Sequence, residues 1–133
     1  MAKHSLPFLL AATAALLLSG CTSPAPSDSS PAADATVLME NFKFDPVELR
    51  VKVGDMVNWI NKDAVQHTVT PTDKEQWGTE GSGDDQSKWL DEGDSWSFTF
   101  TEPGTYTYYC IPHASQSEDG EWKGMVATVV VSE

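Results

Sequence analysis

Cysteine, histidine and positive charge are all scarce in this sequence. Its 133 residues include 2 cysteines and 3 histidines, and 20 acidic residues outnumber 8 basic ones. Two cysteines are too few for the disulfide framework that stabilises many small secreted domains. The formal net charge of −12 disfavours binding to nucleic acid or to anionic lipid surfaces. The acidity favours basic partners or a saline habitat, and the composition is compatible with either.

Long apolar segments are also absent, apart from one near the N-terminus. Residues 6–18 are almost continuously apolar. The run is short for a membrane span and is followed by small residues, so it predicts a secretory signal at residues 1–20. Leu18-Ser19-Gly20-Cys21 resembles the lipobox of bacterial lipoproteins, which implies cleavage before Cys21 and acylation of its thiol. The alternative is an ordinary signal peptide that leaves Cys21 free.

The composition changes twice after the signal. Residues 21–35 are rich in proline, serine and alanine without apolar periodicity, which predicts a flexible linker behind the lipidated Cys21. Residues 36–133 remain for one folded domain. On this interpretation the protein is exported and lipid-anchored, at the outer face of the cytoplasmic membrane or in the periplasm.

Helical periodicity is missing from residues 36–133, which instead contain short strand-like segments. Between residues 47 and 53 apolar and charged residues alternate, which predicts a half-buried strand. Its inward side chains are expected to be Val47, Leu49, Val51 and Val53. Other strands are expected at 36–44, 56–61, 65–70, 95–101, 105–109 and 125–131. Short strands separated by glycine and proline predict an all-β domain, an antiparallel β-sandwich.

Residues 72–94 interrupt the strand pattern with glycines and acidic residues. They predict a long acidic loop with one short strand or helical turn near residues 87–90. Trp77 and Trp89 either pin this loop to the core or serve as exposed contact residues. The acidity of the loop suggests a basic docking face on at least one partner.

The scarce metal-binding residues follow one pattern. Cys110 and His113 are three residues apart at the end of an expected strand, and His67 lies on a separate strand. Met125 opens the last expected strand. A thiolate, two imidazoles and a distant thioether are the ligands of a blue-copper electron-transfer site. The thiolate suits Cu(I), imidazoles suit both oxidation states, and a weak axial thioether completes the set.

Three other functions are compatible with parts of this pattern. A copper-delivery or storage protein would use the same ligands without fast redox turnover, and it remains the main alternative. A cysteine-nucleophile enzyme is disfavoured because the spacing of Cys110 and His113 suits chelation better than a nucleophile–base pair. A plain adhesion domain would leave the ligand set as coincidence. We therefore do not expect an enzyme.

The sequence resembles plastocyanin-type cupredoxins over residues 36–133. The matching motifs are Phe44-Asp45-Pro46, Val51-Lys52-Val53-Gly54-Asp55, Val57-Asn58-Trp59-Ile60-Asn61, His67-Thr68-Val69, Phe100-Thr101-Glu102-Pro103-Gly104-Thr105-Tyr106, Tyr109-Cys110-Ile111-Pro112-His113 and Gly124-Met125-Val126. The resemblance implies a Greek-key sandwich with one type 1 copper that shuttles single electrons between larger redox partners. It implies His67, Cys110 and His113 as equatorial ligands and Met125 as the axial one. It also implies that His113 lies near the surface, within an apolar patch.

One segment departs from the plastocyanin pattern. Residues 114–124 separate His113 from Met125, where plastocyanins have only a few residues. We favour a solvated surface insertion over a partner-specific contact or a lid over His113. The insertion leaves a backbone oxygen or Gln116 as alternative axial ligands. Thr68 is expected either to support the cysteine loop by a hydrogen bond or to be an ordinary strand threonine.

The lipid anchor yields a direct prediction. Cys21→Ser removes the thiol that would be acylated, so we expect the protein to leave the membrane fraction and appear in the soluble fraction. Fractionation of the producing cells measures this. Retention of the variant in the membrane fraction would argue against acylation of Cys21.

Overall fold

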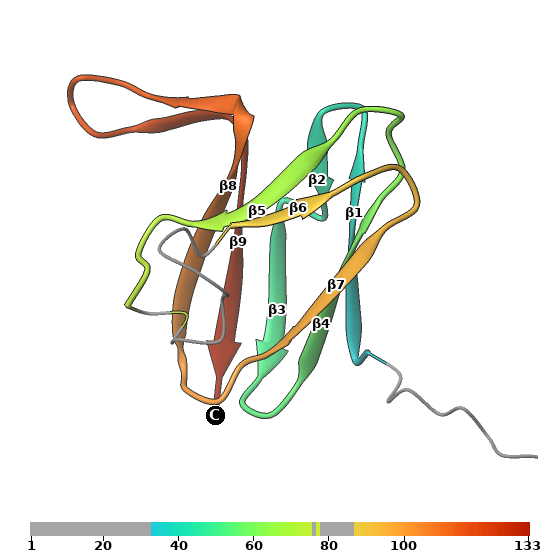
Figure 1. Cartoon of the computed structure of the whole chain (residues 1–133). Helices are drawn as coiled ribbons and strands as arrows, with labels where there is room; N and C mark the ends of the chain where they lie inside the picture. Colours follow the sequence, from blue (N-terminus) through green and yellow to red (C-terminus); the bar gives the residue numbers. More distant parts are fainter. Residues whose placement is uncertain (1–32, 76, 78–86) are drawn as a thin grey trace, which may run out of the picture. The chain divides into compact units, whose positions relative to one another are not determined.

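The computed structural model describes residues 33–75, 77 and 87–133, which form a two-layered sandwich (Figure 1). The expected signal at 1–20 and most of the linker at 21–35 lie outside these residues. Within the described ranges, β-strands make up two sheets, with the orders β2-β1-β4-β7 and β3-β9-β8-β5-β6. There we find no helix with the length and hydropathy needed to cross a membrane. The strands are β1 (Ala35–Glu40), β2 (Lys43–Asp45), β3 (Glu48–Lys52), β4 (Met56–Asn61), β5 (His67–Pro71), β6 (Lys88–Leu90), β7 (Ser95–Thr99), β8 (Gly104–Gln116) and β9 (Trp122–Ser132).

The pairing of the strands confirms the predicted sandwich. β1 runs parallel to β4 and β3 runs parallel to β9. The remaining pairs of the described strands are antiparallel. Several neighbours are far apart in the sequence, and β5 in particular lies beside β8. This places the segment that starts at His67 next to the strand that carries Cys110.

The core between the sheets is unusually aromatic. Trp59 is fully buried, and its ring lies 5.2 Å from that of Trp96 and 5.6 Å from that of Tyr108. Trp77 is 5% exposed and packs 5.3 Å from Phe100, so it fixes its end of the acidic loop to the core. Trp89 is 48% exposed, so it does not fix the loop to the core in the same way. The short strand expected near residues 87–90 is present as β6.

Two details of the predicted strands are wrong. Val47 and Val53 are 64% and 40% exposed, because they lie just outside the ends of the paired strand β3. The single strand expected at residues 36–44 is two strands, β1 and β2, joined by a two-residue turn at Asn41 and Phe42. This turn lies at the same end of the sandwich as the predicted ligands, because the Phe42 ring contacts His67.

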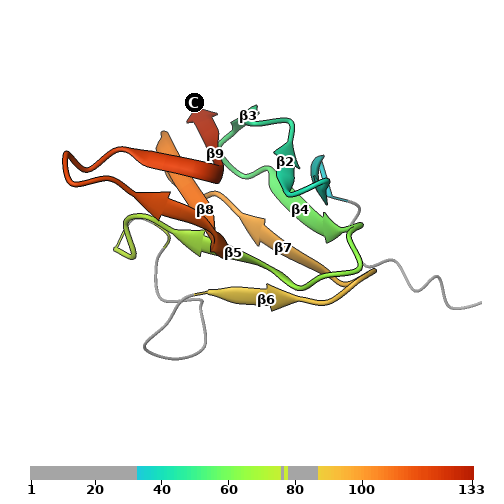
Figure 2. The same cartoon turned by 90° about the horizontal axis from the view of Figure 1, so that it is seen from above.

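The segment 114–124, expected as a solvated surface insertion, is a β-hairpin whose tip is exposed to solvent. Residues 114–116 of β8 pair with residues 122–124 of β9, which extends both strands past their expected ends. The turn is closed by hydrogen bonds from Gly120 N–H to Ser117 O and from Ser117 N–H to Glu121 O. Trp122 stacks on Tyr109 with ring centroids 4.1 Å apart. We call this hairpin the β8–β9 arm, and it projects beyond the rest of its sheet (Figure 2).

Candidate metal centre

Strand pairing brings three of the predicted ligands to one end of the sandwich. His67 opens β5, and Cys110 lies on β8 just beyond Tyr109, which pairs with Thr70 of β5. The β8–β9 register shifts between Tyr109 and Ala114, so residues 110–113 bulge out of the ladder. A bulge frees the chain to re-aim its side chains. It allows both Cys110 and His113 to face His67.

The three ligand atoms form a compact cluster. Cys110 Sγ lies 3.6 Å from Nδ1 of His67 and 3.4 Å from Nδ1 of His113. The two Nδ1 atoms are 3.1 Å apart, and one atom from each residue fits within 4.8 Å of the others. Cys110 and His67 are fully buried, whereas His113 is partly exposed. The arrangement suits a small ion that prefers one sulfur and two nitrogen ligands.

Thr68, on β5, supports the cysteine loop by hydrogen bonds, which confirms the first of the two expectations for this residue. Its backbone N–H donates to Cys110 Sγ over 3.2 Å. Its hydroxyl oxygen accepts the N–H of Ile111 at 2.8 Å and lies 2.9 Å from the hydroxyl of Thr70. These contacts fix the sulfur and the backbone that follows it. Such partners orient ligands and tune the metal that they bind.

Burial shifts the pKa values of Cys110 and His113. It raises the pKa of the Cys110 thiol, and the hydrogen bonds from Thr68 only partly oppose this. Burial and the neighbouring His67 lower the pKa of His113, an effect that Asp63 partly offsets. Both shifts favour the uncharged forms, the thiol of Cys110 and the neutral imidazole of His113. A bound metal must displace the thiol proton, which couples metal binding to proton release.

Asp63 and Asn61 are parts of the site that sequence reasoning missed. Oδ2 of Asp63 lies 2.7 Å from Nε2 of His67, so it turns Nδ1 of the same ring toward Cys110. The buried Asn61 amide donates to Val65 O and Leu90 O, and its Oδ1 accepts the N–H of Asp63. Hydrogen bonds from the backbone N–H of Phe42, from His67 and from Asn41 hold the pKa of Asp63 below its usual range. The sequence feature that could have indicated this contact is the position of Asp63 four residues before His67.

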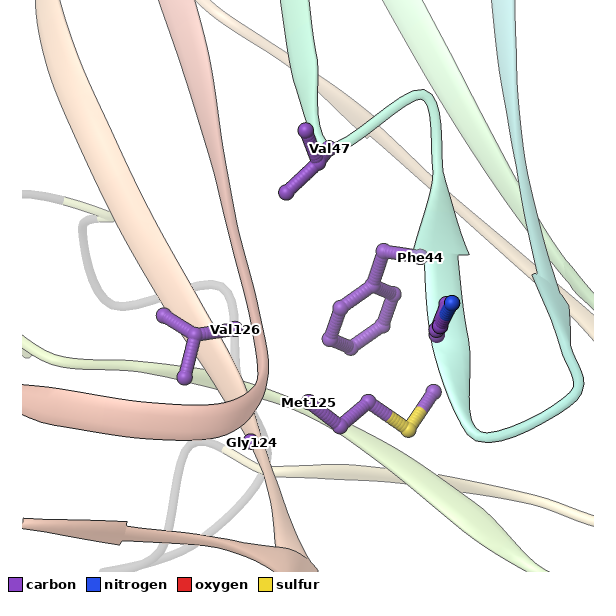
Figure 3. Close-up of a pocket in the computed structure, with 6 residues that line it drawn as sticks. Phe44, Val47, Gly124, Met125 and Val126 are labelled. Carbon is purple, nitrogen blue, oxygen red and sulfur yellow. The ribbon is translucent and has the colours of Figure 1, made fainter.

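Met125 is buried one residue beyond the arm. It is 1% exposed and borders a cavity of about 180 Å³. Figure 3 shows its thioether close to the Phe44 ring at this cavity. Its role as the axial ligand stays a prediction. Gln116, the side-chain alternative, lies on the exposed arm and donates from Nε2 to Gly120 O at 3.1 Å.

Gly124 lets the arm and the metal-binding bulge lie against each other. It pairs with Ala114 and has a φ of +92°, a backbone conformation that residues other than glycine rarely adopt. A Cβ atom at this position would overlap the backbone carbonyl oxygen of His113. Glycine is thus required at the last residue of the arm, next to Met125.

Comparisons with known proteins agree with this geometry. The family model of copper binding proteins, plastocyanin/azurin family, matches residues 32–132. Amicyanin from Paracoccus denitrificans is 36% identical over 93 residues, which cover 68% of each chain. Chloroplastic plastocyanin from Oryza sativa subsp. indica is 34% identical over 91 residues, or 67% of this chain and 54% of that protein. A solved structure of a Cu(I) amicyanin mutant aligns with a TM-score of 0.53 and 33% identity, covering 74% of this chain and 82% of its own.

The close approach at Gly124 predicts the effect of a single methyl group. We expect Gly124→Ala to destabilise the metal-free domain by about 1–3 kcal/mol from backbone strain, with a further loss from the overlap with His113. Denaturant unfolding measures this. The matched control is Gly54→Ala, because Gly54 has a similar φ of +95° but open space around it. Equal losses in the two variants would mean that the contact with His113 costs nothing.

Proposed function

The chain belongs to the plastocyanin/azurin family of copper-binding proteins, and we propose that His67, Cys110, His113 and Met125 hold its one type 1 copper ion. Like its amicyanin and plastocyanin relatives, it is an electron carrier and not an enzyme. The observation that carries the assignment of His67, Cys110 and His113 is the cluster of one buried thiol and two imidazole nitrogens within 4.8 Å. Bound copper would supply the Cu(I)/Cu(II) change that takes up or releases one electron.

The protein's part is to hold these ligands in one geometry for both oxidation states. Thr68 fixes the sulfur, Asp63 fixes the His67 ring, and the bulge of β8 fixes His113. Little rearrangement is then needed when the charge changes, which favours fast electron transfer. Cys110 and His67 are both fully buried. Such burial suits a retained ion better than one handed to another protein, so it disfavours the copper-delivery alternative.

Electrons are proposed to enter or leave through the partly exposed His113. Three exposed apolar residues lie on segments that border the site, namely the β1–β2 turn, the loop before β5 and the bulge of β8. Phe42 is 53%, Val65 42% and Ile111 38% exposed. Apolar surface around a ligand lets a partner approach closely and exclude water.

The proposed partners are redox proteins, at least one with a basic docking face. The chain carries 20 acidic and 8 basic residues, and the tip of the β8–β9 arm presents Glu118, Asp119 and Glu121 to solvent. Much of the acidic loop 72–94 lies outside the described residues. Opposite charges steer diffusional encounter and orient the partners before contact.

The proposal places this carrier outside the cytoplasmic membrane. The support comes from the sequence, namely the apolar run at 6–18 and the lipobox-like motif that ends in Cys21. A lipid on Cys21 would keep the copper domain near membrane-bound partners, with residues 22–35 as the tether.

Copper loading tests the central proposal. When Cu(II) is added to the purified protein, we expect an intense visible band from thiolate-to-copper charge transfer and a reversible redox wave. Cys110→Ser removes the thiolate and should abolish the band. A colourless wild-type protein with no redox wave would refute the assignment.

The axial position is tested in the same preparation. Met125→Leu keeps the buried volume, so the fold should lose less than about 1.5 kcal/mol. The visible band should persist because Cys110 is intact, whereas the reduction potential and the copper EPR spectrum should change. If both stay as in the wild type, another atom occupies the axial position.

The basic docking face is tested by charge reversal. We expect the electron-transfer rate with a small basic redox protein to fall as ionic strength rises. Glu118→Lys on the arm should lower this rate at low salt. Glu102→Lys makes the same charge change in the turn between β7 and β8, at the end of the sandwich opposite the arm, and is the control (Figure 1). Equal effects of the two variants would mean that net charge matters and the arm does not.

A further inference from the structure

The turn between β1 and β2 has an unusual backbone for its sequence. Asn41 and Phe42 have φ values of +56° and +60°, and Glu40 pairs with Lys43 on either side of them. Two-residue hairpin turns with both φ values positive favour Asn-Gly, because glycine alone adopts this conformation without a Cβ penalty. Asparagine tolerates the first position. A phenylalanine at the second position is strained, and such strain clusters at functional sites.

The strained residue presents its ring to the metal site. Phe42 is 53% exposed, so the turn does not serve to bury it in the core. Its ring meets the His113 ring edge-on at 4.9 Å and the His67 ring edge-on at 5.7 Å. The two imidazoles themselves meet edge-on at 4.9 Å. One exposed aromatic ring thus contacts both nitrogen ligands of the proposed centre.

A single carboxylate holds both the turn and one of the histidines. Asp63 accepts the N–H of Asn41 at Oδ1 over 2.8 Å and the N–H of Phe42 at Oδ2 over 3.0 Å. The same Oδ2 lies 2.7 Å from Nε2 of His67. These hydrogen bonds stabilise the left-handed turn against its strain. They also fix the turn and the His67 ring relative to each other.

We propose that Phe42 is a positioning residue for the metal centre. The turn, held by Asp63, seats the Phe42 ring against His67 and His113, and this keeps both Nδ1 atoms directed at Cys110 before a metal binds. The assignment of these residues as copper ligands rests on the proposed function, whereas the ordering of their rings in the metal-free protein does not. A glycine would suit the backbone better, so the site and not the turn explains the phenylalanine.

The metal-free protein gives the first test. In Phe42→Gly the backbone strain disappears, so we expect the unfolding midpoint to stay the same or rise. NMR relaxation and couplings of the His113 side chain should show a second rotamer that the wild type lacks. Phe42→Tyr keeps the ring and, at an exposed site, should keep the single rotamer. A lower midpoint in Phe42→Gly with an unchanged His113 rotamer would mean that Phe42 only packs, and would overturn the proposal.

Copper binding gives the second test. Loss of a supporting partner typically weakens metal binding 10–100-fold, and we expect a loss on the order of tenfold in Phe42→Gly, with recovery in Phe42→Tyr. The copper EPR spectrum of Phe42→Gly should also change. Val53→Ala removes apolar surface at an exposed site beyond the end of β3 and is the control. Wild-type affinity and spectrum in Phe42→Gly would overturn the proposal. A wild type that forms no blue centre would refute the copper assignment instead, and the NMR result would still decide the role of Phe42.

Discussion

The pairing of β5 with β8 is the constraint on which the proposed metal centre depends. It places His67 beside a cysteine that follows it by more than forty residues, and it supplies the Thr68 N–H that donates to the sulfur. Neither strand holds a complete ligand set alone. The site therefore exists only when the sandwich is assembled, and the fold must meet the entropy cost of bringing these segments together before any metal contributes. In return, both strands are stiff elements of one sheet, and ligands on such elements keep their geometry when the charge of the site changes.

A series of hydrogen bonds connects this pair of strands to the neighbouring loop and turn. The buried Asn61 amide holds the loop that carries Asp63, and Asp63 holds His67 on one side and the Asn41–Phe42 turn on the other. Asn61 and His67 are fully buried, so their polar groups would be costly to leave unpaired. The chain of contacts joins the first sheet to the second at the end where the ligands lie. It also explains how a strained turn persists, since the surrounding structure over-determines its conformation.

The sandwich and the proximity of His67, Cys110 and His113 could both be predicted from the sequence. Strand alternation and the rarity of these residue types carry that information. The failures have physical reasons. Val47 and Val53 continue an alternating pattern past the ends of a paired strand, and alternation alone does not show where pairing stops. The Asn41–Phe42 turn was missed because the residue that normally marks such a turn, glycine, is replaced by an aromatic. Asp63 was missed because a carboxylate four residues before a histidine contacts it only in some loop conformations, and the sequence pattern does not specify the conformation of this loop.

The β8–β9 arm shows how a long insertion can leave a metal centre undisturbed. Residues 114–116 and 122–124 resume the β8–β9 ladder beyond the bulge, so the added chain forms its own backbone hydrogen bonds and makes no demand on the ligands. The stacking of Trp122 on Tyr109 fixes the arm to the part of β8 that lies just before Cys110. Gly124 then lets the chain pass the carbonyl of His113 without displacing it. Ladder, stack and glycine thus hold the arm through backbone pairing and one aromatic contact, and none of these contacts uses the Sγ and Nδ1 atoms of the cluster.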